Sequence, residues 1–508
     1  MKLLLTTIKG ECKRTELDLR YLYGIVADAP IDSTLKVFDE VTLDLDIYDE
    51  IVRGQYNIVY LHIDESNERR VITVSEMIKK ALPSTVVIAG GLQVSFDTGA
   101  FMESNPQFDY VIRGEGELVL FNFIRTLLTY EFDFENIAGL AYRSDEGIVV
   151  NPYEALVSPE DLPFPYDKCD LYDTSEVYYE TIRGTSDRSI YSQHIPDPRV
   201  RSLSLNRVCT ELRYFIVKKV ERLVFLDKWF NYNTERAYRI FEYIINNDNG
   251  ITSFEMNMDG DNLDDETIRL LSEARKGLFT FSFDVASTNA ETLAEVGRKE
   301  NIYQLMYNVN KLMQVSKVGI ELNVTAGLPL ETEALFARSF NKVYGLGENT
   351  KLRVHTLRIR RGSLLSEKTG RFGYLYSSYP PYEVISTSLM PALDLINIKA
   401  TARVVDRFAG GEFRYSTQRL MTDASLKPYE FFKKLGEFIS ENGLGNRLGK
   451  TEDRFRVMYQ YAVNIYEEIN DTLKLQIMME SLNRDLENAL PEESIKKFER
   501  KGWDIETW

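Results

Sequence analysis

Residues 178–192, Tyr178-Tyr179-Glu180-Thr181-Ile182-Arg183-Gly184-Thr185-Ser186-Asp187-Arg188-Ser189-Ile190-Tyr191-Ser192, decide the fold of this chain. Aromatic and β-branched side chains predict a buried strand over Val177 to Ile182. The Arg-Gly pair that follows predicts a turn, and the residues after the turn predict a polar loop. The stretch is therefore a strand that opens into a polar loop at its carboxyl end.

The spacing Thr185-x-x-x-Ser189-x-Tyr191-Ser192 resembles the loop of the radical S-adenosylmethionine (SAM) superfamily. In that family the loop is Cys-x-x-x-Cys-x-aromatic-Cys, and its thiolates hold a four-iron, four-sulfur cluster. Only the aromatic residue, Tyr191, matches here. Iron–sulfur clusters are held by thiolates, whereas a hydroxyl has a far higher pKa and is a poor ligand for such iron. We therefore expect degenerate cluster positions at Thr185, Ser189 and Ser192, no iron–sulfur cluster, and no metal ligand from the protein.

Six strand-like runs with helices between them follow this stretch. They are Val177–Ile182, Arg222–Leu226, Ser253–Met256, Leu278–Asp284, Gly319–Thr325 and Leu352–Ile359. Six such repeats with right-handed crossovers predict a partial (β/α)6 barrel of the TIM-barrel type, with its site at the carboxyl ends of the strands.

Several segments at these strand ends also resemble the family. They are Leu226-Asp227-Lys228-Trp229-Phe230-Asn231, Phe254-Glu255-Met256, Asp284-Val285-Ala286-Ser287-Thr288-Asn289 with Arg298, and Ala326-Gly327-Leu328-Pro329. The resemblance implies a SAM site at Tyr191, Glu255, Ser287, Arg298 and Gly327. Ala286 stands where the family has Gln, which removes a hydrogen-bonding amide. Each segment taken alone fits an ordinary strand end equally well.

A basic segment, Arg353-Val354-His355-Thr356-Leu357-Arg358-Ile359-Arg360-Arg361, ends the sixth run. Alternation along a strand places Arg353, His355 and Leu357 on one face, with Val354, Thr356 and Arg358 on the other. One interpretation is a cationic rim that pairs with carboxylates of this acidic protein. The other is a substrate clamp at Arg353, His355 and Arg358 for a carboxylate or phosphate, because arginine suits planar anions.

The first 135 residues alternate strand and helix patterns. Predicted strands are Lys2–Thr6, Leu35–Phe38, Asn57–His62, Thr85–Ala89 and Tyr110–Ile112, and predicted helices begin near Thr15, Leu45, Glu68, Asp97 and Glu117. This alternation predicts a doubly wound, Rossmann-like parallel sheet with a ligand crevice at its carboxyl edge. No Gly-x-Gly-x-x-Gly follows the first strand, so a dinucleotide site is not predicted.

Two glycine turns lie at that edge, Gly90-Gly91-Leu92-Gln93-Val94-Ser95 and Arg113-Gly114-Glu115-Gly116-Glu117. They are either tight turns or places of close approach to a ligand. Their combination resembles the cobalamin-binding domain that precedes many radical SAM enzymes. The resemblance implies cobalamin contacts at Gly90, Gly91, Ser95, Gly114, Glu115, Gly116 and Glu117.

No Asp-x-His-x-x-Gly motif supplies a histidine to cobalt here, and the three histidines are His62, His194 and His355. His62 is either a new ligand near the corrin or, as we expect, a half-buried histidine at a strand end. Leu92, Gln93 and the stretch from Tyr60 to Asn67 depart from the family pattern.

The carboxyl-terminal part has a mostly helical pattern. Its Pro380-Pro381-Tyr382-Glu383-Val384 string resembles the uncharacterised last domain of one branch of these proteins. We predict a cobalamin-binding Rossmann-like domain at 1–135, a hairpin and linker at 136–175, a radical-SAM-like partial TIM barrel at 176–365, and a helical carboxyl-terminal domain at 366–508.

Composition and net charge limit the binding partners and the cellular location that we expect. The net charge of −17 disfavours binding to nucleic acid or to an anionic membrane. No signal peptide or membrane span is predicted. Cys12, Cys169 and Cys209 are too scattered for a disulfide framework or a cluster site. We expect a soluble, cytoplasmic protein.

Three hypotheses for function remain open. The chain is a cluster-free enzyme that keeps cobalamin and SAM for non-radical methyl transfer on a small, anionic substrate. Alternatively, it is a pseudoenzyme that acts as a binding subunit, with a protein partner or as a homo-oligomer. The third hypothesis is a radical SAM enzyme whose cluster cysteines have been replaced. The sequence assigns no catalytic residue.

Overall fold

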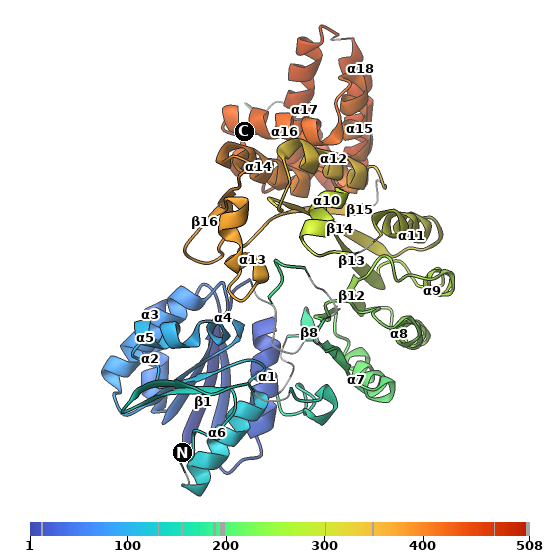
Figure 1. Ribbon diagram of the computed structural model, residues 1–508. Helices are drawn as coiled ribbons and strands as arrows, with labels where there is room; N and C mark the ends of the chain where they lie inside the picture. The colour runs from blue at the N-terminus through green and yellow to red at the C-terminus, as the bar shows by residue number, and fades with distance from the viewer. Residues whose placement is uncertain are drawn as a thin grey trace.

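The computed structural model describes residues 1–11, 14–130, 132–153, 156–169, 171, 173–185, 189–193, 199–299, 301–347, 350–471 and 473–503. Cys12, His194 and residues 186–188 of the quoted loop lie outside these ranges. An amino-terminal α/β part, a second α/β part and a helical carboxyl-terminal part follow one another along the chain (Figure 1). The predicted α/β fold class with a helical last part is confirmed.

The first sheet has seven strands in the order β2-β1-β3-β4-β5-β6-β7. They are β1 (Lys2–Ile8), β2 (Asp32–Phe38), β3 (Ile58–His62), β4 (Val86–Gly90), β5 (Tyr110–Ile112), β6 (Leu140–Ser144) and β7 (Gly147–Val150). The first five strands are parallel, and the order reverses between β1 and β3. The hairpin that we had placed with the linker instead pairs with β5. It satisfies backbone groups that would otherwise be open at a sheet edge.

Helices cover both faces of this sheet, as a doubly wound fold requires. One face packs against α1 (Arg14–Val26) and α6 (Glu117–Thr129). The other packs against α2 (Asp44–Gly54), α3 (Glu68–Ala81) and α5 (Thr98–Ser104), while the short α4 (Leu92–Ser95) follows β4.

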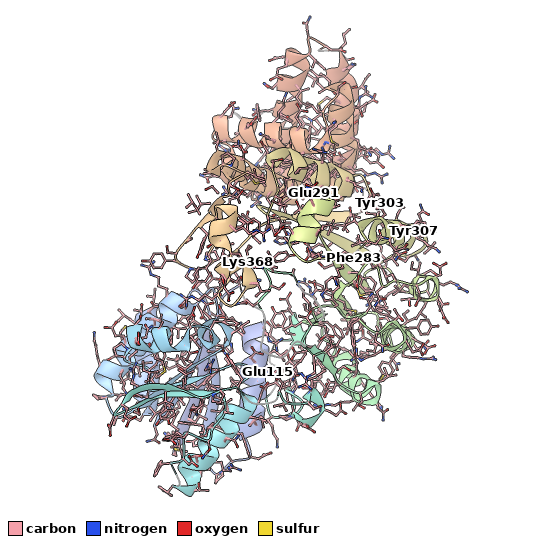
Figure 2. All side chains as sticks on the ribbon, viewed as in Figure 1. Glu115, Phe283, Glu291, Tyr303, Tyr307 and Lys368 are labelled. Carbon is pink, nitrogen blue, oxygen red and sulfur yellow. The ribbon has the colours of Figure 1, made fainter. Side chains whose placement is uncertain are left out.

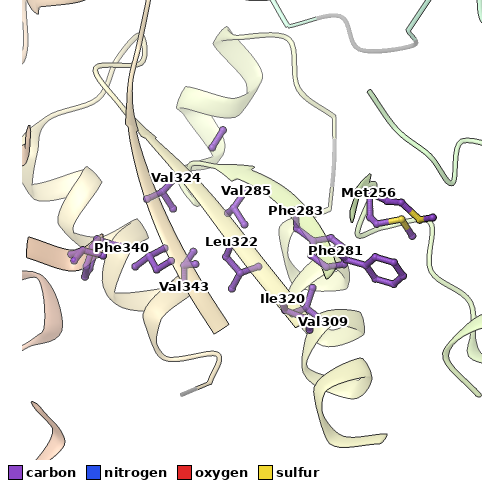
Figure 3. Close-up of a cluster of buried hydrophobic side chains, with 14 of the residues drawn as sticks. Met256, Phe281, Phe283, Val285, Val309, Ile320, Leu322, Val324, Phe340 and Val343 are labelled. Atoms are coloured by element: carbon purple, nitrogen blue, oxygen red, sulfur yellow. The ribbon is translucent and has the colours of Figure 1, made fainter. Parts of the chain in front are cut away.

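The second sheet has six parallel strands in the order β15-β14-β13-β12-β11-β8. They are β8 (Val177–Tyr179), β11 (Arg222–Phe225), β12 (Ser253–Met258), β13 (Phe279–Ala286), β14 (Gly319–Ala326) and β15 (Thr350–Thr356). The connecting helices are α7 (Leu205–Val217), α8 (Thr234–Asn246), α9 (Asp265–Leu271), α10 (Ala290–Glu295), α11 (Ile302–Val315) and α12 (Glu333–Tyr344). Phe281, Phe283, Leu322 and Val324 belong to the apolar core between strands and helices (Figure 3). The polar residues between them in sequence therefore lie on the inner face of the sheet.

The predicted strand Val177–Ile182 is corrected by the structure. It divides into β8 and β9 (Ile182–Arg183), and β9 pairs with β10 (Arg201–Ser202) instead of the barrel sheet. The break falls where the buried Asp227 carboxylate accepts hydrogen bonds from the backbone N–H groups of Thr181 and Ile182, at 2.7 and 2.9 Å. These hydrogen bonds replace the backbone hydrogen bonds that a longer β8 would make with the neighbouring strand.

The predicted strand Leu352–Ile359 is also corrected, because β15 ends at Thr356. Leu357 is buried, and its N–H donates to the carbonyl of Ala326 at 2.9 Å. It therefore does not share an open face with Arg353 and His355, and the predicted alternation stops before it.

The carboxyl-terminal part begins with α13 (Leu364–Glu367) and the hairpin of β16 (Leu375–Tyr376) and β17 (Val384–Ser386). Its helices are α14 (Ala392–Phe408), α15 (Arg414–Asp423), α16 (Pro428–Glu441), α17 (Thr451–Glu468), α18 (Lys474–Ala489) and α19 (Glu492–Lys501). Helix α14 packs on β15 and on α16. In the described part of the chain, no helix combines the length and apolar character that a membrane crossing needs.

Candidate functional site

The degenerate cluster positions lie in the loop after β9. Ser189 and Ser192 hydrogen-bond to each other, with their Oγ atoms 2.7 Å apart, and Ser189 is fully buried. The backbone of Ile190 between them is held on both sides, since its N–H donates to Val296 and its carbonyl accepts from Leu365. Thr185 lies on the far side of the loop residues that the structure does not describe. Two of the three hydroxyls at the cysteine positions therefore bond to one another.

These side chains do not suit an iron–sulfur cluster. All three are neutral hydroxyls, and such clusters are held by thiolates. Among the described residues, no group of three His, Cys, Asp or Glu side chains is placed to hold a metal ion. Cys209 is half-buried on α7, and Cys169 lies in the segment before β8.

Tyr191 and Arg298, two of the predicted SAM contacts, are brought together. Arg298 Nη1 donates to the Tyr191 hydroxyl at 3.1 Å and to Asp284 Oδ2 at 2.9 Å. Its Nη2 donates to the Asp284 carbonyl, and the guanidinium carbon lies 5.9 Å from the ring centre of Trp229. The cluster of Tyr191, Trp229, Asp284 and Arg298 lies where β13 ends beside the loop.

Ser287 and Gly327 meet through a residue that the sequence analysis missed, Glu331. The Ser287 hydroxyl donates to Glu331 Oε1 at 3.2 Å, and Glu331 has no exposed surface. Burial raises the pKa of Glu331 to about 8, against the opposing effect of hydrogen bonds from Ser287 and the backbone of Leu328 and Gly327. The carboxyl group is therefore largely neutral at pH 7. The sequence feature that could have pointed to Glu331 is the Gly-Leu-Pro turn, which ends two residues before it.

Glu255 is not brought to this edge. Strand β12 continues to Met258, so Glu255 lies in its first half and pairs with Arg222, near the opposite end of the sheet. The predicted strand ends at Met256, which would place Glu255 nearer to the carboxyl edge.

The two glycine turns lie at the carboxyl edge of the first sheet, as predicted. The Ser95 hydroxyl joins them, because it donates to the carbonyl of Gly91 at 2.9 Å and accepts from the N–H of Gly114 at 2.8 Å. Gly91, Gly114 and Gly116 have positive φ angles of 103°, 73° and 86°, a region in which side chains are disfavoured. A turn conformation is thus sufficient to explain these three glycines.

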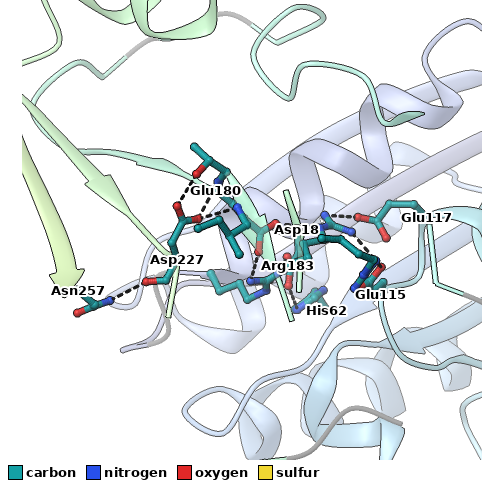
Figure 4. A network of polar contacts seen from close by, with 12 residues as sticks. Asp18, His62, Glu115, Glu117, Glu180, Arg183, Asp227 and Asn257 are labelled. Carbon is teal, nitrogen blue, oxygen red and sulfur yellow. Dashed lines mark hydrogen bonds and ion pairs between the residues drawn. The ribbon is translucent and has the colours of Figure 1, made fainter. Parts of the chain in front are cut away.

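Glu115 and Glu117 contact the barrel. Arg183 from β9 donates to Glu117 at 2.7 Å, to Glu180 at 2.9 Å and to Glu115 at 3.3 Å. Arg201 also pairs with Glu115, which lies between the two α/β parts (Figures 2 and 4). We call Glu115, Glu117, Glu180, Arg183 and Arg201 the Arg183 cluster.

His62 is fully buried, and not half-buried as expected. Its side chain is 6% exposed, its Nδ1 lies 3.3 Å from the Tyr60 hydroxyl, and its Nε2 lies 3.7 Å from Asp18. Burial lowers the pKa of His62 to about 4, so its imidazole is neutral near pH 7.

The predicted substrate residues on and after β15 pair with protein carboxylates. Arg353 pairs with Glu321 and Asp406, and Arg358 pairs with Glu11 and Glu65. His355 is exposed, and its Nε2 lies 3.2 Å from Asn323 Oδ1. These contacts favour the cationic-rim interpretation, and a substrate clamp stays a prediction.

Two family models match this chain. Residues 182–343 match the Radical SAM superfamily, and residues 370–505 match a family described as protein of unknown function (DUF4080). The chain therefore carries a radical SAM superfamily domain followed by a DUF4080 domain. This confirms the resemblance on which the sequence analysis relied.

Its relatives include methyltransferases. The cobalamin-dependent radical SAM methyltransferase TokK of Streptomyces tokunonensis is 33% identical over 20% of this chain and 15% of its own length. The uncharacterized methyltransferase PH0819 of Pyrococcus horikoshii is 28% identical over 44% of this chain and 51% of its own length. The chain thus spans less than two thirds of either relative.

Solved structures share the fold at low identity. The cobalamin-dependent SAM radical enzyme OxsB, solved with aqua-cobalamin and SAM, has a TM-score of 0.64 and 14% identity over 96% of this chain and 80% of its own. The radical SAM methyltransferase TsrM of Kitasatospora setae, solved with cobalamin and a [4Fe-4S] cluster, has a TM-score of 0.59 and 16% identity over 75% of this chain and 78% of its own. These likenesses support the predicted Rossmann-like and barrel architecture.

Proposed function

We propose that this chain is a cluster-free relative of the cobalamin-dependent radical SAM methyltransferases that binds SAM without cleaving it reductively. The hydrogen bond between Ser189 and Ser192 carries this proposal. Reductive cleavage of SAM needs an electron from an iron–sulfur cluster, and hydroxyls in place of all three thiolates leave that cluster without ligands.

We place SAM at the barrel edge between two groups of residues. The first is the cluster of Tyr191, Trp229, Asp284 and Arg298, and the second is the Ser287–Glu331–Gly327 group. The support is the resemblance of these segments to the family and their position at the carboxyl ends of barrel strands. Bound SAM would meet a neutral acid and an arginine that is already paired.

We therefore favour a binding subunit that acts through a partner. The test is a calorimetric titration of the full chain with SAM, followed by chromatography of the mixture under reducing, anaerobic conditions. Saturable binding with intact SAM supports the proposal. Release of 5′-deoxyadenosine, or a failure to bind SAM, contradicts it.

A second candidate is a cobalamin-dependent enzyme that transfers methyl groups by a polar route. The fold shared with OxsB over 96% of the chain favours this candidate. It requires cobalamin to bind this chain, so a corrin absorption band that co-purifies with the protein separates it from the first candidate.

The third hypothesis, recent replacement of the cysteines, has its own test in the triple variant Thr185→Cys, Ser189→Cys and Ser192→Cys. Anaerobic reconstitution with iron and sulfide, followed by SAM cleavage, would show that the rest of the radical machinery is intact. We expect no cleavage if the barrel has adapted to a binding role.

A further inference from the structure

The cofactor that the fold family implies would lie at the carboxyl edge of the first sheet. The strand order reverses between β1 and β3, and ligands of such sheets bind at the crevice where this reversal occurs. The glycine turns that follow β4 and β5 lie at this edge, and the resemblance to the family implied cobalamin contacts there. Whether the crevice can accept a corrinoid depends on what occupies the space beside these glycines.

Tyr60 occupies the space beside Gly90. A Cβ atom built on Gly90 would lie 2.1 Å from the Tyr60 hydroxyl oxygen. Tyr60 is 1% exposed and belongs to the core between the sheet and helices α1 and α6. The missing side chain of Gly90 is therefore required by the packing of Tyr60, which fills the space beside this glycine.

His62 occupies the space beside Gly91 in the same way. A Cβ atom on Gly91 would lie 2.9 Å from His62 Nε2 and 2.4 Å from the carbonyl oxygen of Ile63. His62 in turn lies against Asp18 of α1. Two consecutive side chains on one face of β3 thus fill the space that both glycines create.

The polar groups at this edge are also engaged. Ser95 bonds to the two glycine turns, and Glu115 and Glu117 belong to the Arg183 cluster. The Arg183 side chain is 2% exposed and lies over the ring of Tyr21 at 4.8 Å. A guanidinium this deeply buried requires its carboxylate partners, because an unpaired buried charge is strongly unfavourable. A ligand that used Glu115, or Oε1 of Glu117, would have to break these pairs, whereas Oε2 of Glu117 is buried and accepts no hydrogen bond.

We infer that the two glycine turns of this edge do not accept cobalamin in this protein: Tyr60 and His62 fill the space beside Gly90 and Gly91, and the Arg183 cluster joins the second turn to the barrel. The first sheet then acts as a binding surface for the barrel loop instead of as a cofactor domain. This inference deepens the proposed function, because it assigns the Rossmann-like part a structural role in a binding subunit. It also disfavours the second candidate.

The test uses hydroxocobalamin as the probe and the full chain as purified. After incubation and gel filtration, the corrin absorbance per chain is compared with that of TokK treated in parallel. We expect at least tenfold less corrin on this chain. Retention of about one equivalent per chain would overturn the inference. That result would leave the proposed lack of reductive SAM cleavage untouched, so the two can fail separately.

A variant tests which side chains close the crevice. In the double variant Tyr60→Ala/His62→Ala we expect at least tenfold more retained corrin than in the matched control Phe123→Ala. Phe123 is buried in the same apolar core as Tyr60 and packs against Tyr110, whereas the nearest atoms to a Cβ built on Gly90 or Gly91 belong to Tyr60, His62 and Ile63. If the double variant does not fold, as judged by circular dichroism, the single variant His62→Ser replaces it. A folded variant that retains no more corrin than Phe123→Ala contradicts the assignment to Tyr60 and His62.

Discussion

Glu331 makes the stability of the protein depend on pH. Its pKa rises from 4.5 to about 8 because folding buries the carboxyl group. A group whose pKa is raised in the folded state contributes stability that is fully present below the unfolded pKa. That stability is lost as the pH rises through the folded value. This residue should therefore lower the free energy of unfolding progressively between about pH 4.5 and pH 8.

Glu331→Gln tests this consequence. The amide cannot ionise, so we expect the variant to exceed the wild type in free energy of unfolding by up to roughly 5 kcal/mol at pH 9. At pH 5 the two should be close. Urea unfolding at both pH values is the measurement. Parallel pH profiles for the two proteins would show that Glu331 does not carry the predicted proton.

The variant Arg298→Met tests the proposed SAM site. Replacement by Met removes the hydrogen bonds to Tyr191 and Asp284, and we expect SAM binding to weaken at least tenfold. The control is Arg222→Met, because Arg222 pairs with Glu176 and Glu255 at the other end of the barrel. Calorimetric titration of both variants gives the comparison, and equal affinity for SAM would place the ligand elsewhere.

The contact between β9 and the first sheet depends on one buried arginine. Arg183→Met leaves three carboxylates, Glu115, Glu117 and Glu180, without that partner, and breaking a buried pair costs about 3–5 kcal/mol. Arg222→Met again provides the control, because Arg222 is 44% exposed and exposed pairs contribute about 1 kcal/mol or less. Denaturant midpoints of the two variants should differ accordingly. A loss of similar size in both would mean that the Arg183 cluster adds nothing beyond an exposed pair.

The elements themselves were largely predictable from sequence. The strand Tyr110–Ile112 and the start of α6 at Glu117 coincide with the prediction, because apolar runs bounded by glycine turns leave few alternatives. The strand predicted over 177–182 is divided into β8 and β9 in the structure, because the carboxylate of Asp227, which is distant in sequence, accepts hydrogen bonds from its backbone. Local propensity contains no information about such a partner.

The candidate site was predictable only in part, because its contacts join segments that are distant in sequence. The resemblance to the family singled out Tyr191, Ser287 and Arg298, but the hydrogen bonds of Tyr191 with Arg298 and of Ser287 with Glu331 are visible only in the structure. The partners of Glu115 and Glu117 could not be inferred, since Arg183 lies 66 residues beyond Glu117 and in the other α/β part. The filling of the glycine turns by Tyr60 and His62 likewise becomes visible only when β3 and β4 are adjacent.

At the scale of the whole molecule, the chain shares the fold of OxsB and TsrM, and we propose that it differs at the places where two cofactors would be held. Hydroxyls stand at the cluster positions, and side chains fill the glycine turns of the first sheet. The two changes are independent, because one lies in the barrel loop and the other in the Rossmann-like part. We propose that each change removes a cofactor site while preserving the packing around it.

The most direct test of the central claim is anaerobic reconstitution of the unmodified chain with iron and sulfide, followed by metal analysis and incubation with SAM and a reductant. We predict far less than one cluster equivalent of iron per chain and no 5′-deoxyadenosine. TokK treated in the same way controls for the reconstitution. A brown protein with four irons per chain that cleaves SAM reductively would contradict the account.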